Sequence, residues 1–342
     1  MRVNPRETVT VLAAGLLVWP VLDAPARPKP LEPVRLAVGS RPGNIVYLQI
    51  DLALALGYFA EEGLNVSADY FDGGTGAAKA LVSRNDDFSA NSIDHAITMR
   101  ASGEQLKMIA SFTSLPTVSV VVQRDLRTKI RSIGDLKGKR IGVTAIGAGT
   151  HVLTASILKK AGYSLSDVTI VPVGSGDSLI QAMKRRDVDV ALSSDPTTTS
   201  VLMGGDASLL LDLVTFEETQ RIFTGGYQFT GLLTRPEVID TRGATAQRMV
   251  NAIVRTNRFI ATHSGAEIAA RLPAKIVQDR YIFVKGLQHS RACFPRDSMV
   301  TLAGVANNLQ SQIAFGSIKP QPLPDPASFF DMRFVLHAPA DR

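Results

Sequence analysis

Cysteine is almost absent from this chain of 342 residues, since Cys293 is its only one. An intrachain disulfide is therefore excluded in any compartment, and the fold must depend on its apolar cores. No cysteine lies near Ala24 to accept a lipid, which argues against a lipoprotein. Aromatic residues make up only 6% and do not alternate with basic runs, so the sequence predicts no nucleic-acid partner.

The sequence patterns of common cofactor and metal sites are also missing. The chain has no Gly-Lys-Ser/Thr phosphate loop, and its five histidines form no close pair with metal-ligand spacing. Gly147 and Gly149 imitate the start of a dinucleotide fingerprint, but no third glycine follows at the required spacing. We therefore expect no metal and no cofactor.

One pattern typical of an enzyme remains as an alternative. Cys293 follows His289 by four residues, which would place a thiol and an imidazole on one helical face as a nucleophile and its base. A buried thiol beside an incidental histidine is the favoured interpretation, because no activating glycine-rich turn and no third partner accompany the pair. We expect that the chain is not an enzyme and keep a cleft enzyme using His289 and Cys293 as the alternative.

The N-terminus has the order of a secretory signal. Two arginines precede a mostly apolar run over 9–22, and small residues follow up to Ala26. We predict a signal peptide over 1–26 and a proline-rich linker over 27–32, with an uncleaved membrane anchor as the alternative. The remaining chain is expected to be a soluble periplasmic protein. Its net charge of +6 comes from scattered cations and suits a small acidic ligand.

Strand and helix patterns alternate along the chain, which predicts an α/β protein with mostly parallel sheets. Two similar series follow one another, the first complete by about residue 115. The predicted strands are 34–38, 64–70, 88–90 and 106–111 in the first series and 118–122, 141–144, 168–173 and 188–192 in the second. Two such units predict two lobes, with a ligand-binding cleft at the strand ends and helix starts between them.

Two loops of small residues are candidates for holding an anion. The loops over 73–76 and 146–150 each join a strand to a helix, so backbone N–H groups and a positive helix end can point at a carboxylate or sulfonate. If they belong to different lobes, the two loops face each other as halves of a clamp. The alternative is that the glycines only permit positive φ and that Thr75 is a helix N-cap.

Polar side chains at other strand ends extend this candidate site. The candidate ligand-binding residues are Ser40, Arg41, Asn44, Gly74, Thr75, Ser92, Ser114, Gly147, Gly149, Thr150, Ser175, Asp195 and Tyr227. Hydroxyl groups dominate this set, so hydrogen-bond geometry more than charge is expected to discriminate among ligands. Arg41 is equally a candidate for a solvated loop residue, Asp195 for a cap of the next helix, and Tyr227 for a hinge or core residue.

Three motifs in a fixed order carry a family resemblance. The segments Leu56-Gly57-Tyr58-Phe59, Gly73-Gly74-Thr75 and Ile133-Gly134-Asp135-Leu136-Lys137-Gly138-Lys139 resemble the substrate-binding proteins of nitrate/sulfonate/taurine-type ABC importers. The resemblance covers roughly residues 33–265. The segments 88–91 and 193–196 depart from the family pattern at predicted cleft positions, so the ligand cannot be carried over from the family.

The resemblance implies a two-lobed periplasmic-binding-protein fold of type II, with two crossing segments that allow hinge closure. Lobe 1 would take residues 33–119, lobe 2 would take 120–226, and 227–342 would return to lobe 1 and add the C-terminal helices. The implied function is that of a monomeric binding component that captures a small anionic organic solute (a sulfonate, a carboxylate or a nitrate-like ion) and delivers it to an ABC permease and its ATPase. A binder of thiamine pyrimidine precursors is the alternative within the fold.

Overall fold

The computed structural model describes residues 1, 30–319 and 322–340 of the chain. It separates into two units, residues 1–30 and 31–342. Apart from Met1, the predicted signal peptide lies outside the described residues, as does the predicted linker up to residue 29. All elements described below belong to the second unit.

The first of two sheets contains strands from both the start and the later part of this unit. Its strands are β1 (Glu32–Val38), β2 (Leu64–Tyr70), β3 (Phe88–Ser92), β4 (Lys107–Ser111) and β10 (Thr230–Thr234), in the spatial order β2-β1-β3-β10-β4. Strand β1 pairs in parallel with β2 and β3, whereas β10 is antiparallel to β3 and β4. We call this sheet, together with the helices that lie between β1 and β4 along the chain, lobe 1.

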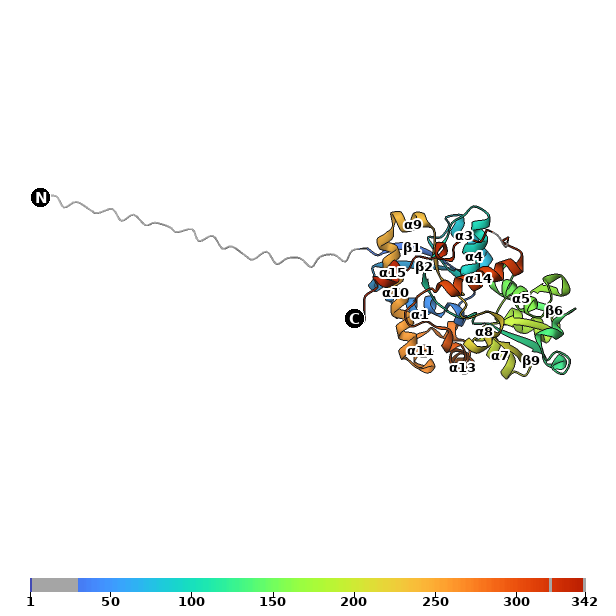
Figure 1. Ribbon diagram of the computed structural model, residues 1–342. Coiled ribbons are helices and arrows are strands. Elements are labelled where there is room, and N and C mark those ends of the chain that lie inside the picture. Colours follow the sequence, from blue (N-terminus) through green and yellow to red (C-terminus); the bar gives the residue numbers. More distant parts are fainter. Residues whose placement is uncertain (2–29, 320–321, 341–342) are drawn as a thin grey trace. The chain divides into compact units, whose positions relative to one another are not determined.

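The second sheet repeats this arrangement. Its strands are β5 (Ser119–Gln123), β6 (Arg140–Val143), β7 (Thr169–Pro172), β8 (Val190–Ser193) and β9 (Ala207–Asp212), in the order β7-β6-β8-β5-β9. Strand β6 is parallel to β7 and β8, and β5 is antiparallel to β8 and β9. The chain passes from one sheet to the other between β4 and β5 and returns between β9 and β10 (Figure 1). We call this sheet and the helices among its strands lobe 2.

Helices follow most of the strands. In lobe 1 they are η1 (Ile45–Tyr47), α1 (Leu48–Leu56), α2 (Tyr58–Glu61), α3 (Gly74–Val82) and α4 (Ile93–Ala101), and in lobe 2 they are α5 (Gly149–Lys160), α6 (Asp177–Lys184), α7 (Thr197–Met203) and α8 (Phe216–Ile222). The C-terminal helices are α9 (Pro236–Thr241), α10 (Gly243–Thr262), α11 (Gly265–Arg271), α12 (Ala274–Val277), α13 (Arg280–Ser290), α14 (Leu302–Phe315) and α15 (Arg333–Leu336). Helix α10 packs on α1 and α2, and α14 packs on both α4 and α5 (Figure 1).

A helix with the length and hydrophobicity to cross a membrane is not found in the described part of the chain.

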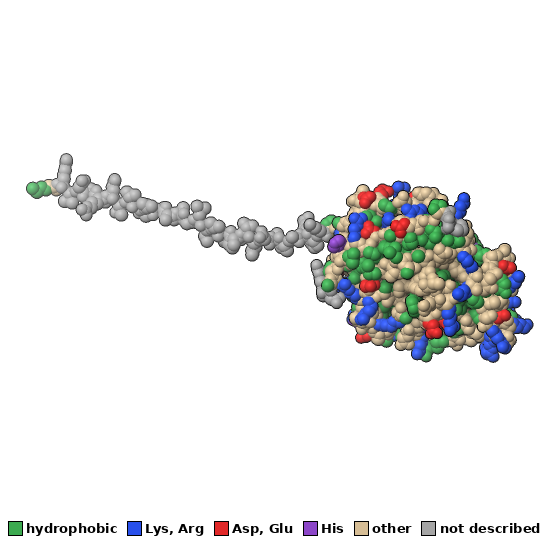
Figure 2. Space-filling model, in the orientation of Figure 1, with side chains coloured by type: hydrophobic (Ala, Val, Ile, Leu, Met, Phe, Trp, Pro, Cys, Tyr) green, Lys and Arg blue, Asp and Glu red, His purple; other side chains and the backbone are tan. Residues whose placement is uncertain are grey.

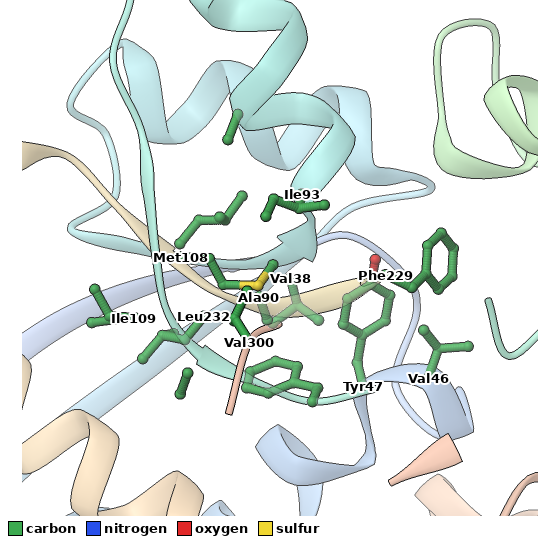
Figure 3. Packing of buried hydrophobic residues seen from close by; sticks show 14 of the residues in the cluster. Val38, Val46, Tyr47, Ala90, Ile93, Met108, Ile109, Phe229, Leu232 and Val300 are labelled. Carbon is green, nitrogen blue, oxygen red and sulfur yellow. The ribbon is translucent and has the colours of Figure 1, made fainter. Parts of the chain in front are cut away.

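The main core of lobe 1 lies along the middle strands of its sheet. Val38, Ala90, Met108 and Leu232 come from adjacent strands and are fully buried (Figure 3). Strands covered by helices on both faces need apolar residues at nearly every position, which explains their short, continuous apolar runs. Figure 3 also shows Val46, Tyr47 and Phe229 together at one edge of this cluster.

Charged side chains lie mostly at the surface and often in pairs. On the face shown in Figure 2, Lys and Arg side chains are spread among acidic and uncharged ones. Arg140 reaches Asp189 at 2.7 Å, and Arg242 reaches Asp87 at 2.7 Å. Such partly exposed pairs contribute little stability individually.

Replacing Glu32 with glutamine is expected to weaken the attachment of β1 to α10 and to reduce the loss of stability in acid. Arg242 and Thr245 donate hydrogen bonds to Glu32 at 2.8 and 2.7 Å. These bonds, that of Arg242 above all, lower the pKa of Glu32 from 4.5 to about 2. Because this pKa is lowered by folding, the stabilisation is complete above the unfolded value of 4.5 and is lost as the pH falls toward 2. Urea unfolding of both proteins over this range measures the difference, and equal acid dependence would contradict it.

Candidate ligand-binding site

A small cavity of about 40 Å³ lies between the two lobes, at the ends of strands and the starts of helices. Its walls are polar and apolar in about equal measure. The polar lining residues are Ser40, Asn44, Asp72, Asn91, Ser92 and His95 from lobe 1 and Thr144, Thr150, Ser175 and Ser194 from lobe 2. Val46, Tyr47, Val118 and Phe229 provide the larger apolar surfaces. A mixed lining of this kind suits a small molecule with both polar and apolar parts.

Three helices begin at this cavity without a side-chain cap. The N-cap residues of α3, α4 and α5 are Gly73, Ser92 and Ala148, and none of them makes a side-chain capping hydrogen bond. Among the helices that begin elsewhere, α8, α11, α13 and α14 are capped by Thr215, Ser264, Asp279 and Thr301, whereas α10 and α12 also have no side-chain cap. The first N–H groups of a helix need acceptors, and the positive end of its dipole favours negative charge. The first N–H of α4, that of Ile93, donates to the Phe229 carbonyl oxygen at 2.9 Å. Ligand oxygens in the cavity can supply acceptors for other N–H groups at the three helix starts.

Three buried polar side chains at the start of α4, those of Ser92, Asp94 and His95, have side-chain atoms without a hydrogen-bond partner among the described residues. Ser92 and His95 are each 2% exposed, and neither Ser92 Oγ nor His95 Nε2 has a hydrogen-bond partner among the described residues. A serine at an N-cap position normally accepts a hydrogen bond from a backbone N–H, so a Ser92 hydroxyl without a partner is unusual. Leaving a buried polar atom unsatisfied costs about 1 to 3 kcal/mol, which a bound ligand would recover.

Glycine at position 74 makes room for these side chains. Asn91 donates to the Gly74 carbonyl oxygen at 2.8 Å, and its own Oδ1 accepts from the Ser92 N–H at 2.9 Å. A Cβ on Gly74 would lie 2.4 Å from both Asn91 Oδ1 and His95 Nε2. The first residue of α3 therefore has to be a glycine for this wall of the cavity to form.

The two small-residue loops lie side by side at the cavity. The Thr75 hydroxyl of lobe 1 donates to the Ile146 carbonyl oxygen of lobe 2 at 3.3 Å. Within the lobe 2 loop, the Gly147 N–H donates to His151 Nδ1 at 3.1 Å, and the Thr144 N–H donates to the Thr150 hydroxyl at 3.0 Å. The lobes also touch where the Ile45 N–H donates to the Asp195 carbonyl oxygen at 3.0 Å. The two loops that were expected to face each other are thus in contact across the lobes.

Among the described residues, no lysine or arginine lines this cavity. Arg41 donates to Asp72 at 2.8 Å at the rim, where both side chains are exposed. Burial raises the pKa of Tyr47 well above its usual range, so its hydroxyl keeps its proton and can donate. Neutral donors and helix ends, not a cationic side chain, therefore dominate the polar wall.

The structure brings part of the predicted residue set together at the cavity. Ser40, Asn44, Gly74, Ser92, Gly149, Thr150 and Ser175 line it. Thr75 and Gly147 lie at the contact between the loops, and Arg41 lies at the rim. The sequence prediction did not include His95, although its position three residues after the Ser92 cap on the same helix turn would have been a usable signal.

Three predicted residues lie away from the cavity lining. The Ser114 hydroxyl donates to the Cys293 carbonyl oxygen at 3.4 Å. Asp195 precedes α7 by two residues, and its carboxylate accepts a hydrogen bond at 3.1 Å from the Thr199 N–H in the first turn of that helix. This contact agrees with the capping alternative. Tyr227 is fully buried and its ring packs against Phe223 with centroids 4.4 Å apart, as expected for a core residue.

The nucleophile and base pair of the enzyme alternative does not form. His289 Nδ1 and Nε2 lie 2.7 and 2.8 Å from carboxylate oxygens of Asp195 and Asp212, which raises the pKa of His289 to about 10. Cys293 Sγ donates to the Val214 carbonyl oxygen, and burial raises the pKa of this thiol to about 12. Both imidazole nitrogens are therefore occupied, and the thiol stays protonated.

Comparison with known families identifies the chain. Residues 44–265 match the protein-family model described as NMT1/THI5 like. The chain belongs to the NMT1/THI5-like family. No curated protein sequence matches this family member.

Solved structures similar to this NMT1/THI5-like protein span nearly its whole length. A protein from Bordetella bronchiseptica RB50 is 28% identical, with a TM-score of 0.82 over 89% of this chain and 96% of that one. The alkanesulfonate-binding protein SsuA of Xanthomonas axonopodis pv. citri, bound to MOPS, is 17% identical, with a TM-score of 0.71 over 88% and 98% of the two chains. The periplasmic nitrate-binding protein NrtA of Synechocystis PCC 6803 is 12% identical, with a TM-score of 0.66 over 85% and 83%. The predicted periplasmic-binding-protein fold and the resemblance to nitrate/sulfonate/taurine-type binding proteins are confirmed.

Proposed function

We propose that this NMT1/THI5-like protein is the solute-binding component of an ABC importer. It captures a small anionic organic solute, a sulfonate, a carboxylate or a nitrate-like ion, in the cavity between its lobes. It then delivers the solute to a membrane permease and its ATPase as an exported, monomeric, non-enzymatic protein. Structural neighbours whose names describe alkanesulfonate and nitrate binding support this class of function.

One observation carries the proposal: the uncapped starts of α3, α4 and α5 surround the same cavity as the unpaired atoms Ser92 Oγ and His95 Nε2. Oxyanions accept hydrogen bonds from backbone N–H groups and hydroxyls, and three positive helix ends favour their charge. A hydrogen bond between a neutral donor and a charged acceptor contributes about 1.5 to 3 kcal/mol. Several such bonds are enough to hold a small anion without a lysine or arginine.

The apolar wall indicates that the solute also has a carbon skeleton. Val46, Val118 and Phe229 line the cavity. Each methylene group placed against such a surface contributes about 0.8 kcal/mol. An organic anion can contact both the polar and the apolar wall, whereas an inorganic ion has no apolar part to place against the second.

A melting-temperature screen tests the proposal. The protein without residues 1–26 is heated with methanesulfonate, MOPS, acetate, nitrate or a neutral aminopyrimidine. A bound ligand at 100 times its Kd stabilises the fold by about 2.7 kcal/mol, which raises Tm by on the order of 5 °C. We expect at least one organic anion, and not the aminopyrimidine, to produce this shift.

Two serine variants at the two ends of α4 test the role of the cavity hydroxyl, and the second of them is the control. Ser92→Ala removes a hydroxyl from the cavity and is expected to weaken anion binding about tenfold. Ser102→Ala removes an exposed hydroxyl at the opposite end of the same helix and should leave binding unchanged. A shift by the aminopyrimidine alone would instead favour the thiamine-precursor alternative, and turnover of any ligand would contradict a pure binding role.

A further inference from the structure

The loop 146–150 of lobe 2 is closed by a histidine that does not itself line the cavity. His151 is the third residue of α5, and its side chain is buried. Its Nδ1 accepts a hydrogen bond from the Gly147 N–H at 3.1 Å. Among the described residues, the Gly147 N–H has no other acceptor. The imidazole therefore holds the turn that leads into α5.

The turn fixed by His151 carries two features of the site. The carbonyl oxygen of Ile146, just before Gly147, accepts from the Thr75 hydroxyl of lobe 1 at 3.3 Å. Ala148, just after Gly147, is the N-cap residue of α5, provides no side-chain cap and lines the cavity. Movement of Gly147 would therefore disturb both the contact between the lobes and the helix start that faces the solute.

This hydrogen bond specifies where the imidazole carries its proton. A ring nitrogen that accepts a hydrogen bond has no proton of its own, so the neutral ring of His151 carries its N–H at Nε2. In the charged ring both nitrogens are donors. The Nδ1–H and the Gly147 N–H would then point at each other. A second proton on His151 and the closed turn therefore exclude each other.

The surroundings of His151 favour the neutral ring. Burial lowers the pKa of His151 from 6.5. The ring packs edge-to-face on Phe315 of α14, with centroids 4.8 Å apart. The first turn of α5 is also the positive end of the helix dipole, where a cation is unfavourable. The imidazole is therefore neutral at pH 7, and the turn is closed.

The elements packed against α5 supply no ionic partner for this histidine. Helix α14 and strand β8 have no charged residue. The charged and titratable groups on the other packed elements and on α5 itself are Asp94, His95 and Arg100 on α4, Asp135 on η3 (Ile133–Leu136), Asp167 on η4 (Leu165–Asp167), Glu217, Glu218 and Arg221 on α8, and Lys159 and Lys160. None of them pairs with His151 in the part of the chain that the structure describes, and its pKa is lowered by burial.

We propose that His151 is a positioning residue whose neutral Nδ1 holds the loop 146–150 closed, and that a proton taken up by its imidazole opens the loop and releases the solute. This inference rests on the proposed function, because it takes the solute to be an anion at the start of α5. The sign of the effect is distinctive. An imidazolium that acted on the anion only through its charge would tighten binding in acid, whereas opening of the loop weakens it.

A pH series of anion binding tests the inference by calorimetry. The probe is methanesulfonate, or nitrate if the melting screen identifies that ion, because both keep one negative charge from about pH 8 to about pH 4.5. Below the pKa of His151 we expect the affinity to fall by up to about tenfold per pH unit, since the apparent Kd rises as the competent fraction of the protein falls. Protonation of His95 in the cavity would act in the opposite direction, so each affinity is divided by that of His151→Asn, which keeps His95. A ratio that is constant, or that rises as the pH falls, would overturn the inference.

Two substitutions at position 151 separate the hydrogen bond from the charge. His151→Leu removes the acceptor of the Gly147 N–H and should weaken binding about tenfold at pH 7.5. His151→Asn places an amide oxygen where Nδ1 lies, which accepts a hydrogen bond and takes up no proton in this range. It should restore most of the lost affinity and lack the weakening in acid. If the two variants bind alike, or if His151→Asn weakens in acid as much as the original protein, His151 does not position the loop.

Another histidine provides the matched control. His337 is exposed and follows the end of α15. His337→Asn makes the same change of side chain away from α5. It should keep both the affinity and the pH dependence of the original protein. A pH dependence lost equally in His337→Asn and His151→Asn would assign the effect to net charge and overturn the inference.

Nitrogen NMR of the imidazoles gives a measurement that does not depend on affinity, with His151→Asn used to assign the signal. In the free protein at pH 7.5, His151 should carry its proton on Nε2, and a proton on Nδ1 would overturn the inference. Addition of the anion should lower the pKa of His151 further, because solute and proton exclude each other. A raised pKa would show a direct charge contact and overturn the proposed role. If neither anion binds, the proposed function fails for these ions, whereas the tautomer in the free protein still decides whether His151 holds the loop.

Discussion

Replacing His289 with alanine is expected to lower the free energy of unfolding by about 3 to 5 kcal/mol at pH 7, as for removal of one partner from a buried ion pair. His289 lies on α13, and its two nitrogens contact Asp195 and Asp212 of lobe 2. The Asp195 side chain is 1% exposed and also accepts hydrogen bonds from Ser290 and Thr199. Loss of the imidazole would leave a buried carboxylate next to α13 without its positive partner.

The pH dependence of this effect has a definite sign. Hydrogen bonds with Asp195, and then with Asp212, raise the pKa of His289 from 6.5 to about 10. Because folding raises this pKa, the stabilisation is fully present below pH 6.5 and is lost as the pH rises through about 10. The difference in stability between the original protein and His289→Ala should therefore shrink steadily over this interval.

Urea unfolding at several pH values across that interval measures the difference. His337→Ala is the matched control, because His337 is an exposed histidine at the end of α15. It should change stability by less than about 0.5 kcal/mol at every pH. A His289→Ala effect that is small at pH 7, or that does not depend on pH, would show that the imidazole is not a charged bridge to lobe 2.

Local patterns were enough to predict most of the strands. The strand 64–70 was predicted with the bounds that β2 has, because an alternation of apolar and polar residues between a glycine and a glycine-rich loop is a strong signal. The strand 88–90 extends to Ser92, since Asn91 and Ser92 are buried despite being polar. Helix α4 was not predicted, because Asp94 and His95 in its first turn are buried too and obscure the amphipathic period. Buried polar residues thus hide the elements that carry them.

Local sequence patterns could not predict most of the long-range contacts. His289 is 94 residues from Asp195 and 77 from Asp212, and the sequence spacing instead favoured a partner four residues away. The contact between the loops 73–76 and 146–150 could be predicted, because each loop joins a strand to a helix in its own lobe. The contact between Gly43 and Ile276 of α12 could not be predicted, since it arises only through tertiary packing.

Replacing Gly74 with alanine is expected to weaken anion binding at least tenfold and to lower stability by about 1 to 3 kcal/mol, the usual cost of overpacking. The new Cβ would lie 2.4 Å from Asn91 Oδ1 and His95 Nε2, and both of these side chains are buried. Neither can move away without breaking the bond from Asn91 to the Gly74 carbonyl oxygen or shifting the start of α4. One methyl group therefore disturbs two of the three helix starts that surround the cavity.

The chain provides a matched control at the first residue of another helix. Gly243 begins α10, and a Cβ on it would meet no atom within 4 Å. Gly243→Ala should thus leave binding unchanged and leave stability the same or slightly higher, because alanine is favoured over glycine in helices by about 1 kcal/mol. Calorimetric titration with the anion identified in the melting screen measures both variants. If Gly74→Ala binds as well as Gly243→Ala, the wall formed by Asn91 and His95 does not contact the ligand, and the anion must lie closer to α5 of lobe 2.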